Sequence, residues 1–138
     1  MERMSIQDFR ELMARTNGKK AAASEHDLQV ACVRWFRIQY DQYAKLLFAI
    51  PNGGQRNEIV AAKLKAEGVL SGAPDLFLAL PRGGSHGLWI EMKNGKAGRV
   101  SDSQKEMIAL LEKEGYACAI CHTMDEFAEI IGEYIFGD

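Results

Sequence analysis

Apolar residues recur every three or four positions along the segment 24–40. The recurring positions are Leu28, Ala31, Cys32, Trp35 and Ile38. This spacing is typical of one face of an α-helix, and Ser24 is a residue type that commonly caps a helix N-terminus. We therefore predict a helix from Ser24 to about Tyr40 that packs its apolar face against a core.

Elsewhere, short apolar runs bounded by glycine and proline predict β-strands. The predicted strands are 45–50, 75–80, 88–93 and 116–122. The turn-forming sequence over 81–87 joins the second and third of these as an antiparallel hairpin. The segment 88–122 is long enough for a parallel, right-handed crossover, so the predicted sheet is mixed.

Three further helices are predicted between these strands and after them. They cover about 56–67, with Gly68 just past the end, 101–115, and 124–135. Ser101 followed by Gln104 has the pattern of a capping box. The predicted fold class is α/β, with a mixed central sheet of about four strands flanked by helices.

Length and composition favour one globular unit. The chain has 138 residues, of which 47% are hydrophobic and 26% are charged, as in ordinary folded domains. We expect a short helix and a basic linker over 1–23 and the globular domain over 24–138. No apolar run approaches the roughly 18–20 residues that cross a membrane. The charged N-terminus and an odd number of cysteines, three, favour a reducing cytoplasmic setting.

The net charge of −2 is an average over two unlike regions. Residues 112–138 contain seven acidic residues and one lysine, so the rest of the chain is basic overall. An overall acidic charge is therefore a weak argument against nucleic acid as a partner.

The residues with the most chemical information are Pro74-Asp75 and Glu91-Met92-Lys93. Side chains alternate along a strand, so Glu91 and Lys93 share one face and Met92 takes the other. In an antiparallel hairpin the start of one strand lies beside the end of the next, which brings Asp75 to Glu91 and Lys93. Two neighbouring carboxylates repel each other, and a divalent cation such as Mg²⁺ or Mn²⁺ relieves that repulsion. The simpler alternative is a surface ion pair between Glu91 and Lys93 on an edge strand.

Pro74-Asp75 followed by Glu91-Met92-Lys93 resembles the signature of the PD-(D/E)XK nuclease superfamily. The wider pattern resembles its VRR-NUC branch, especially the compact stand-alone members from phage-type genomes. The matching residues are Ser24-Glu25 with Gln29, the stretch 50–54, Gly68, the stretch 72–75, the stretch 91–93, and Ser101 with Gln104.

This resemblance implies a restriction-endonuclease-like αβββαβ core and a metal-dependent DNA endonuclease. It implies that Asp75 and Glu91 are metal ligands, with Glu25 and the Met92 carbonyl as additional ligands. Lys93 would be the catalytic lysine, which positions the attacking water.

Gln104 would reach the site from its helix, although capping that helix alone is an open alternative, as dipole stabilisation is for Glu25. Compact relatives of this kind are homodimers that act on branched DNA such as Holliday junctions. The resemblance also implies the cytoplasm of a phage host or bacterium.

Basic and glycine-rich loops supply candidate DNA contacts. They are Asn52, Gly53, Arg56, Lys96 and Arg99. A helix start preceded by glycines can bind phosphate through backbone N–H groups. A plain turn and solvated loop charges are the alternatives for these positions.

Other functions are weaker readings of the same residues. Cys118 and Cys121 with His122 have zinc-like spacing, but residues three apart on a strand point to opposite faces. A non-cleaving nucleic-acid-binding module of the same fold and a nucleotide-binding α/β domain are the main rivals. Neither glycine-rich loop has the pattern of a phosphate-binding loop. An interaction domain that uses the acidic C-terminal segment is a third alternative.

Overall fold

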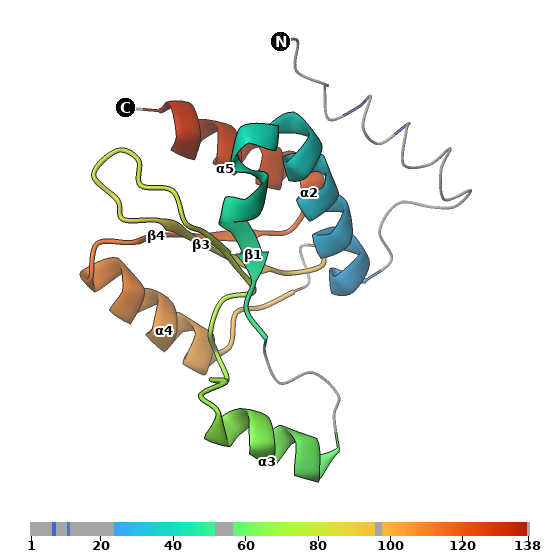
Figure 1. The fold of residues 1–138 in the computed structure, drawn as a ribbon, viewed down its shortest axis with the longest axis vertical. Coiled ribbons are helices and arrows are strands. Elements are labelled where there is room, and N and C mark those ends of the chain that lie inside the picture. Colours follow the sequence, from blue (N-terminus) through green and yellow to red (C-terminus); the bar gives the residue numbers. More distant parts are fainter. Residues whose placement is uncertain (1–6, 8–10, 12–23, 52–56, 96–97, 138) are drawn as a thin grey trace.

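A four-stranded sheet in the order β1-β2-β3-β4 forms the centre of the molecule (Figure 1). The computed structural model describes residues 7, 11, 24–51, 57–95 and 98–137. The strands are β1 (Leu47–Ala49), β2 (Leu76–Leu78), β3 (Leu88–Met92) and β4 (Ala117–Cys121). β1, β2 and β3 pair antiparallel, and β3 pairs with β4 in parallel. The mixed sheet and the hairpin are therefore as predicted.

Helices cover both faces of the sheet. They are α2 (Glu25–Gln39), α3 (Glu58–Ala66), α4 (Asp102–Lys113) and α5 (Met124–Phe136), and a 3₁₀ helix, η1, covers Asp41–Leu46. Figure 1 shows α2 and α5 on one side of the sheet and α4 on the other. None of the helices in the described ranges is long and apolar enough to cross a membrane.

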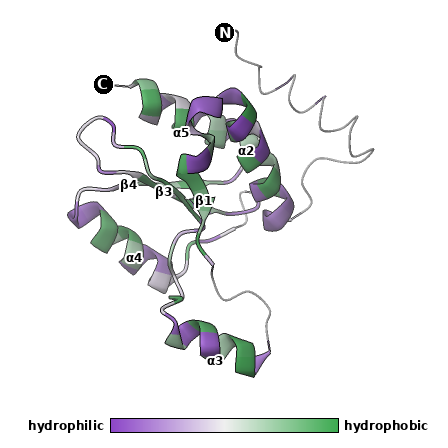
Figure 2. Ribbon diagram, viewed as in Figure 1, coloured by the Kyte–Doolittle hydropathy of each residue, from purple (hydrophilic) through white to green (hydrophobic). Residues whose placement is uncertain are grey.

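The core lies between the sheet and the pair α2 and α5. Leu76, Leu78 and Ile90 from the sheet are fully buried there, together with Phe36 of α2 and Ile131 of α5. Figure 2 shows the amphipathic character of these helices, with polar residues on their outer sides. Apolar residues at alternate strand positions and at helical spacing thus produce one continuous core.

Two sequence predictions about this region were wrong. Lys45 and Leu46 are in the 3₁₀ helix η1 and not in the first strand, because a short apolar run alone does not distinguish strand from helix. Ile38 is 50% exposed, and Phe36 occupies the core position instead. The short helix predicted within 1–23 falls mostly outside the described residues, of which Gln7 and Glu11 are helical.

The N-terminal caps of the helices explain where they begin. The side chains of Ser24, Asn57, Ser101 and Thr123 each accept a hydrogen bond from a backbone N–H in the first turn. The capping box of Ser101 and Gln104 is present in full. A cap satisfies backbone donors that the helix itself leaves free.

Gly72 holds the loop before β2 against the start of α4. Its φ is +94°, and a Cβ at this position would lie 2.9 Å from the backbone oxygen of Ser103. Gly68 has a similar φ of +105°, but a Cβ there would have no atom within 4 Å. The two glycines have the same kind of backbone, and only Gly72 lies in close contact.

We predict that Gly72→Ala destabilises the protein more than Gly68→Ala does. Both changes place an L-residue in the left-handed region, which costs about 1–2 kcal/mol. Gly72→Ala also forces the two backbones apart, which adds about 1–3 kcal/mol. Urea unfolding of both variants measures the difference. Equal losses would show that the close approach of the loop to α4 does not contribute.

Candidate active site

Asp75, Glu91 and Lys93 lie together on the face of the sheet opposite the main core. The register pairs Leu76 with Ile90, and both of these point into the core. Because side chains alternate, Asp75, Glu91 and Lys93 point to the other face. The backbone N–H of Met92 donates to Asp75 Oδ2 at 2.7 Å, which fixes Asp75 beside the end of β3. The sequence prediction that the hairpin brings these residues together is met by this geometry.

Glu91 is a buried acid. The residue is 3% exposed and is the only charged residue among the described ones that is fully buried. Its Oε2 atom accepts a hydrogen bond from Gln104 Nε2 at 2.7 Å and lies 3.3 Å from Lys93 Nζ. Its Oε1 atom is buried and has no hydrogen-bond partner among the described residues. A buried polar atom without a partner is costly and points to a missing ligand.

The surroundings of Glu91 disfavour its charged form. Together they raise the pKa of its carboxyl from 4.5 to about 7, and burial is the largest cause. The nearby Asp75 carboxyl also contributes to the rise, whereas the Lys93 ammonium lowers the pKa. The lysine thus offsets only part of the cost of a charged Glu91 at this position.

Gln104 has two roles at once. Its Oε1 accepts the Ser101 backbone N–H at 2.8 Å, which completes the capping box of α4. Its Nε2 donates to Glu91. Capping and a contact with the site, which were alternatives in the sequence, therefore occur together in one side chain.

Glu25 lies near the acids but does not complete a three-acid cluster with them. Its Oε1 is 3.5 Å from the backbone N–H of Asn94, the residue after Lys93. No group of three or more His, Cys, Asp and Glu side chains converges as metal ligands within the described ranges. Glu25 as a metal ligand stays a prediction.

Met92 lies with its side chain in the core, 1% exposed. Its N–H points to Asp75. In a strand the N–H and C=O of one residue point to the same side, so its carbonyl faces the Asp75 side as well. The backbone of Met92 is therefore placed where a ligand to the acids is needed.

The residues present match a hard divalent cation. Two carboxylates lie next to each other, and one buried oxygen, Oε1 of Glu91, has no partner in the described part of the chain. Mg²⁺ and Mn²⁺ bind such oxygen ligands and complete their shells with water, so two or three protein ligands are sufficient.

Four of the five predicted DNA contacts, Asn52, Gly53, Arg56 and Lys96, lie outside the described residues. Arg99 is exposed and lies just before α4. Gly98 was not among the predicted site residues, and a Cβ there would lie 2.9 Å from Lys93 Cβ. Its position five residues after the predicted catalytic lysine was the available signal.

We predict that Glu91 makes the stability of the metal-free protein depend on pH. The folded-state pKa is raised, so the folded protein holds a proton between about pH 4.5 and 7 that the unfolded chain has lost. The contribution of Glu91 is therefore present below about pH 4.5 and is lost as the pH rises to about 7. Its size is on the order of 3 kcal/mol.

Urea unfolding in a chelator between pH 4 and 8 tests this dependence. Glu91→Gln removes the proton exchange, so its difference in free energy of unfolding from wild type changes across this window. Glu106→Gln, at an exposed position of α4, is the control and keeps the wild-type profile. Parallel curves for Glu91→Gln and wild type would contradict the raised pKa.

Comparison with known proteins links this chain to a family of domains. The model of the VRR-NUC domain matches residues 10–125. A solved structure described as a VRR_NUC domain protein superposes with a TM-score of 0.72 and 31% sequence identity. The match covers 83% of this chain and 89% of the other. A search of curated proteins found no match.

Proposed function

This chain belongs to the VRR-NUC domain family, and on that premise we propose that it is a divalent-metal-dependent endonuclease that hydrolyses phosphodiester bonds in DNA. VRR-NUC domains are nuclease domains in general. The observation that carries the proposal is the buried Glu91 beside Asp75, with one carboxylate oxygen that has no partner among the described residues.

The proposed roles follow from the contacts of each side chain. Asp75 and Glu91 would hold Mg²⁺ or Mn²⁺, with the Met92 carbonyl and Glu25 as further candidate ligands. When bound, such an ion stabilises the negative charge of the reacting phosphoryl group and makes water a stronger nucleophile at neutral pH.

Lys93 and Gln104 both contact the carboxylate of Glu91. The Lys93 side chain is 12% exposed and its Nζ lies 3.3 Å from Glu91 Oε2, so the ammonium is held at the acids by charge. From there it orients the attacking water and offsets charge that develops on the phosphoryl oxygens. Gln104 donates to the same carboxylate oxygen and thereby fixes the orientation of Glu91.

We predict that Asp75→Asn and Lys93→Ala each lower cleavage of DNA in Mg²⁺ or Mn²⁺ at least about a hundredfold. Lys113→Ala, an exposed lysine at the far end of α4, is the matched control and keeps wild-type activity. Calorimetric titration with Mn²⁺ gives a second readout, because Asp75→Asn weakens binding whereas Lys93→Ala does not.

Two outcomes would overturn the proposal. One is full activity of both variants. The other is a wild-type protein that binds DNA but cleaves no substrate in either metal, which favours the non-cleaving binding module.

We further propose that the protein acts as a homodimer on branched DNA. An isologous dimer presents two equivalent centres, which suits the cleavage of two strands at a junction. The sheet face that carries the acids also carries aromatic residues, and neighbouring rings of Phe48, Phe77 and Trp89 are in contact. Phe48 is 44% exposed, so this face offers an apolar surface for a second copy.

We predict that sedimentation equilibrium gives twice the chain mass of 15.4 kDa, and that Phe48→Asp returns the protein to a monomer. Ile59→Asp, at a position on α3 that is 71% exposed, is the control. Cleavage of a four-way junction should exceed that of linear duplex of the same sequence. A monomeric wild type, or equal rates on the two substrates, would contradict this part of the proposal.

A further inference from the structure

A groove that none of the proposed catalytic residues lines separates α2 from the edge strand β1. Its volume is about 330 Å³, and its lining includes Gln29, Val33 and Arg37 of α2, Ala49 of β1 and Leu76 of β2. This volume is at the low end for ligand sites.

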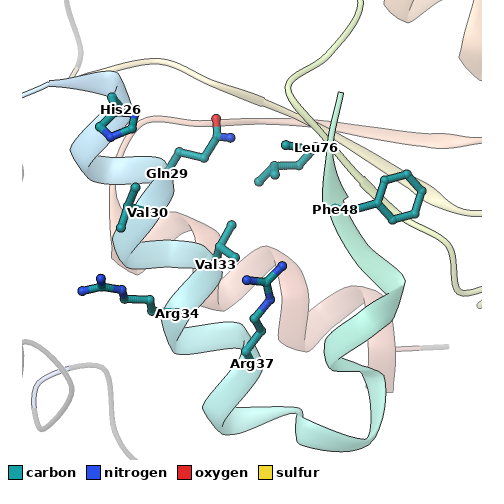
Figure 3. Close-up of a pocket in the computed structure, with 9 residues that line it drawn as sticks. His26, Gln29, Val30, Val33, Arg34, Arg37, Phe48 and Leu76 are labelled. Carbon is teal, nitrogen blue, oxygen red and sulfur yellow. The ribbon is translucent and has the colours of Figure 1, made fainter. Parts of the chain in front are cut away.

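The helix side of the groove is ordered along its length. Gln29, Val33 and Arg37 are spaced by four residues and therefore form one row on α2, about 12 Å long. Figure 3 shows the Gln29 and Arg37 side chains directed toward the space between α2 and β1, with Val33 between them. The row thus has an amide at one end, an apolar side chain in the middle and a guanidinium at the other end.

The charged residues that line the groove are basic. Its lining contains Arg34, Arg37 and His26 and no acidic residue. Both arginines are exposed, and neither forms an ion pair with a carboxylate in the described ranges. A guanidinium without an acidic partner has free donors in a planar fork that matches phosphate.

The strand side of the groove offers backbone groups. The N–H of Ile50 donates to the Asp75 carbonyl, so the neighbouring pair Ala49 and Leu76 is the one without mutual hydrogen bonds. The N–H and C=O of Ala49 therefore point away from β2, and in the described sheet β1 is an edge strand. Phe48 also belongs to the lining, and Figure 3 shows its ring turned away from α2.

Two residues of the groove are close in sequence to predicted site acids. Leu76 follows Asp75 directly, and Gln29 lies one helical turn after Glu25. Asp75 and Leu76 point to opposite faces of β2, so a chain that passes from the acids into the groove crosses the sheet at its end, beside Ala49.

We propose that this α2–β1 groove binds one strand of the DNA substrate on one side of the cleaved bond, with Arg37 in contact with its phosphates. The inference rests on the proposed nuclease function and adds a strand path to it. Phosphate contacts of this kind position a substrate without reading its sequence.

Binding of a fluorescent single-stranded oligonucleotide, measured by anisotropy in a chelator so that no cleavage occurs, tests the groove. Arg37→Ala should raise Kd roughly tenfold and should lower the slope of log Kd against log salt by about 0.7, the contribution of one phosphate contact on a single strand. Arg37→Lys keeps the charge and should keep the slope. Lys113→Ala, outside the groove, should bind as wild type.

A pair of tryptophan variants tests whether the oligonucleotide occupies the groove, without a change in its charge. Val30→Trp fills the groove, which Val30 lines, and should weaken binding of the oligonucleotide. Ile38→Trp adds the same ring to an exposed position of α2 outside the lining and should have no effect. Thermal melting confirms that both variants are folded.

The two hypotheses fail in different ways. If wild type cleaves DNA but Arg37→Ala and Val30→Trp keep its Kd and salt slope, the groove proposal is overturned and the nuclease proposal stands. That is also the result expected if the free edge of β1 accepts a peptide or a second copy of the chain. If cleavage is absent but binding depends on Arg37 and on Val30, the groove proposal stands and the nuclease proposal fails.

Discussion

The register between β2 and β3 is the constraint on which both the core and the candidate active site depend. It pairs Leu76 with Ile90, which places these two residues in the core. The same register places Asp75 beside Glu91 on the opposite face. A slip of one residue would exchange the two faces of a strand, so it would bury Glu91 among apolar side chains. The burial of Leu76 and Ile90 therefore keeps the two acids together.

Keeping Glu91 buried beside a second acid has a free-energy cost that its neighbours reduce only in part. Lys93 supplies a positive charge at 3.3 Å and Gln104 a hydrogen bond at 2.7 Å, but both reach the same oxygen, Oε2. Removing a carboxylate from water without full compensation is unfavourable. A protein retains such an arrangement where the strain serves a function, and the Oε1 oxygen is the position at which a cation would relieve it.

The sequence predicted the elements whose causes are local. Alternation of Glu91, Met92 and Lys93 gave the correct faces, and Ser101 with Gln104 gave the start of α4. Features that depend on contacts between distant segments were not predictable in this way. The close approach of Gly72 to Ser103 depends on where α4 docks, and helical spacing alone did not decide whether Phe36 or Ile38 entered the core. The contact of Gln104 with the site was expected only from the family resemblance, with capping alone as the alternative, because its distance from Glu91 is a tertiary property.

Acidic and basic residues of the chain gather on different elements of the fold. α5 carries exposed acids such as Glu129 and Glu133 and packs beside β4 and α2. The groove with Arg34 and Arg37 lies at β1, the opposite edge of the sheet. A nucleic-acid strand on the proposed path along β1 would meet the local positive charge of this groove. The fold thus gives an overall acidic protein a basic approach to the end of the sheet where Asp75 and Glu91 lie.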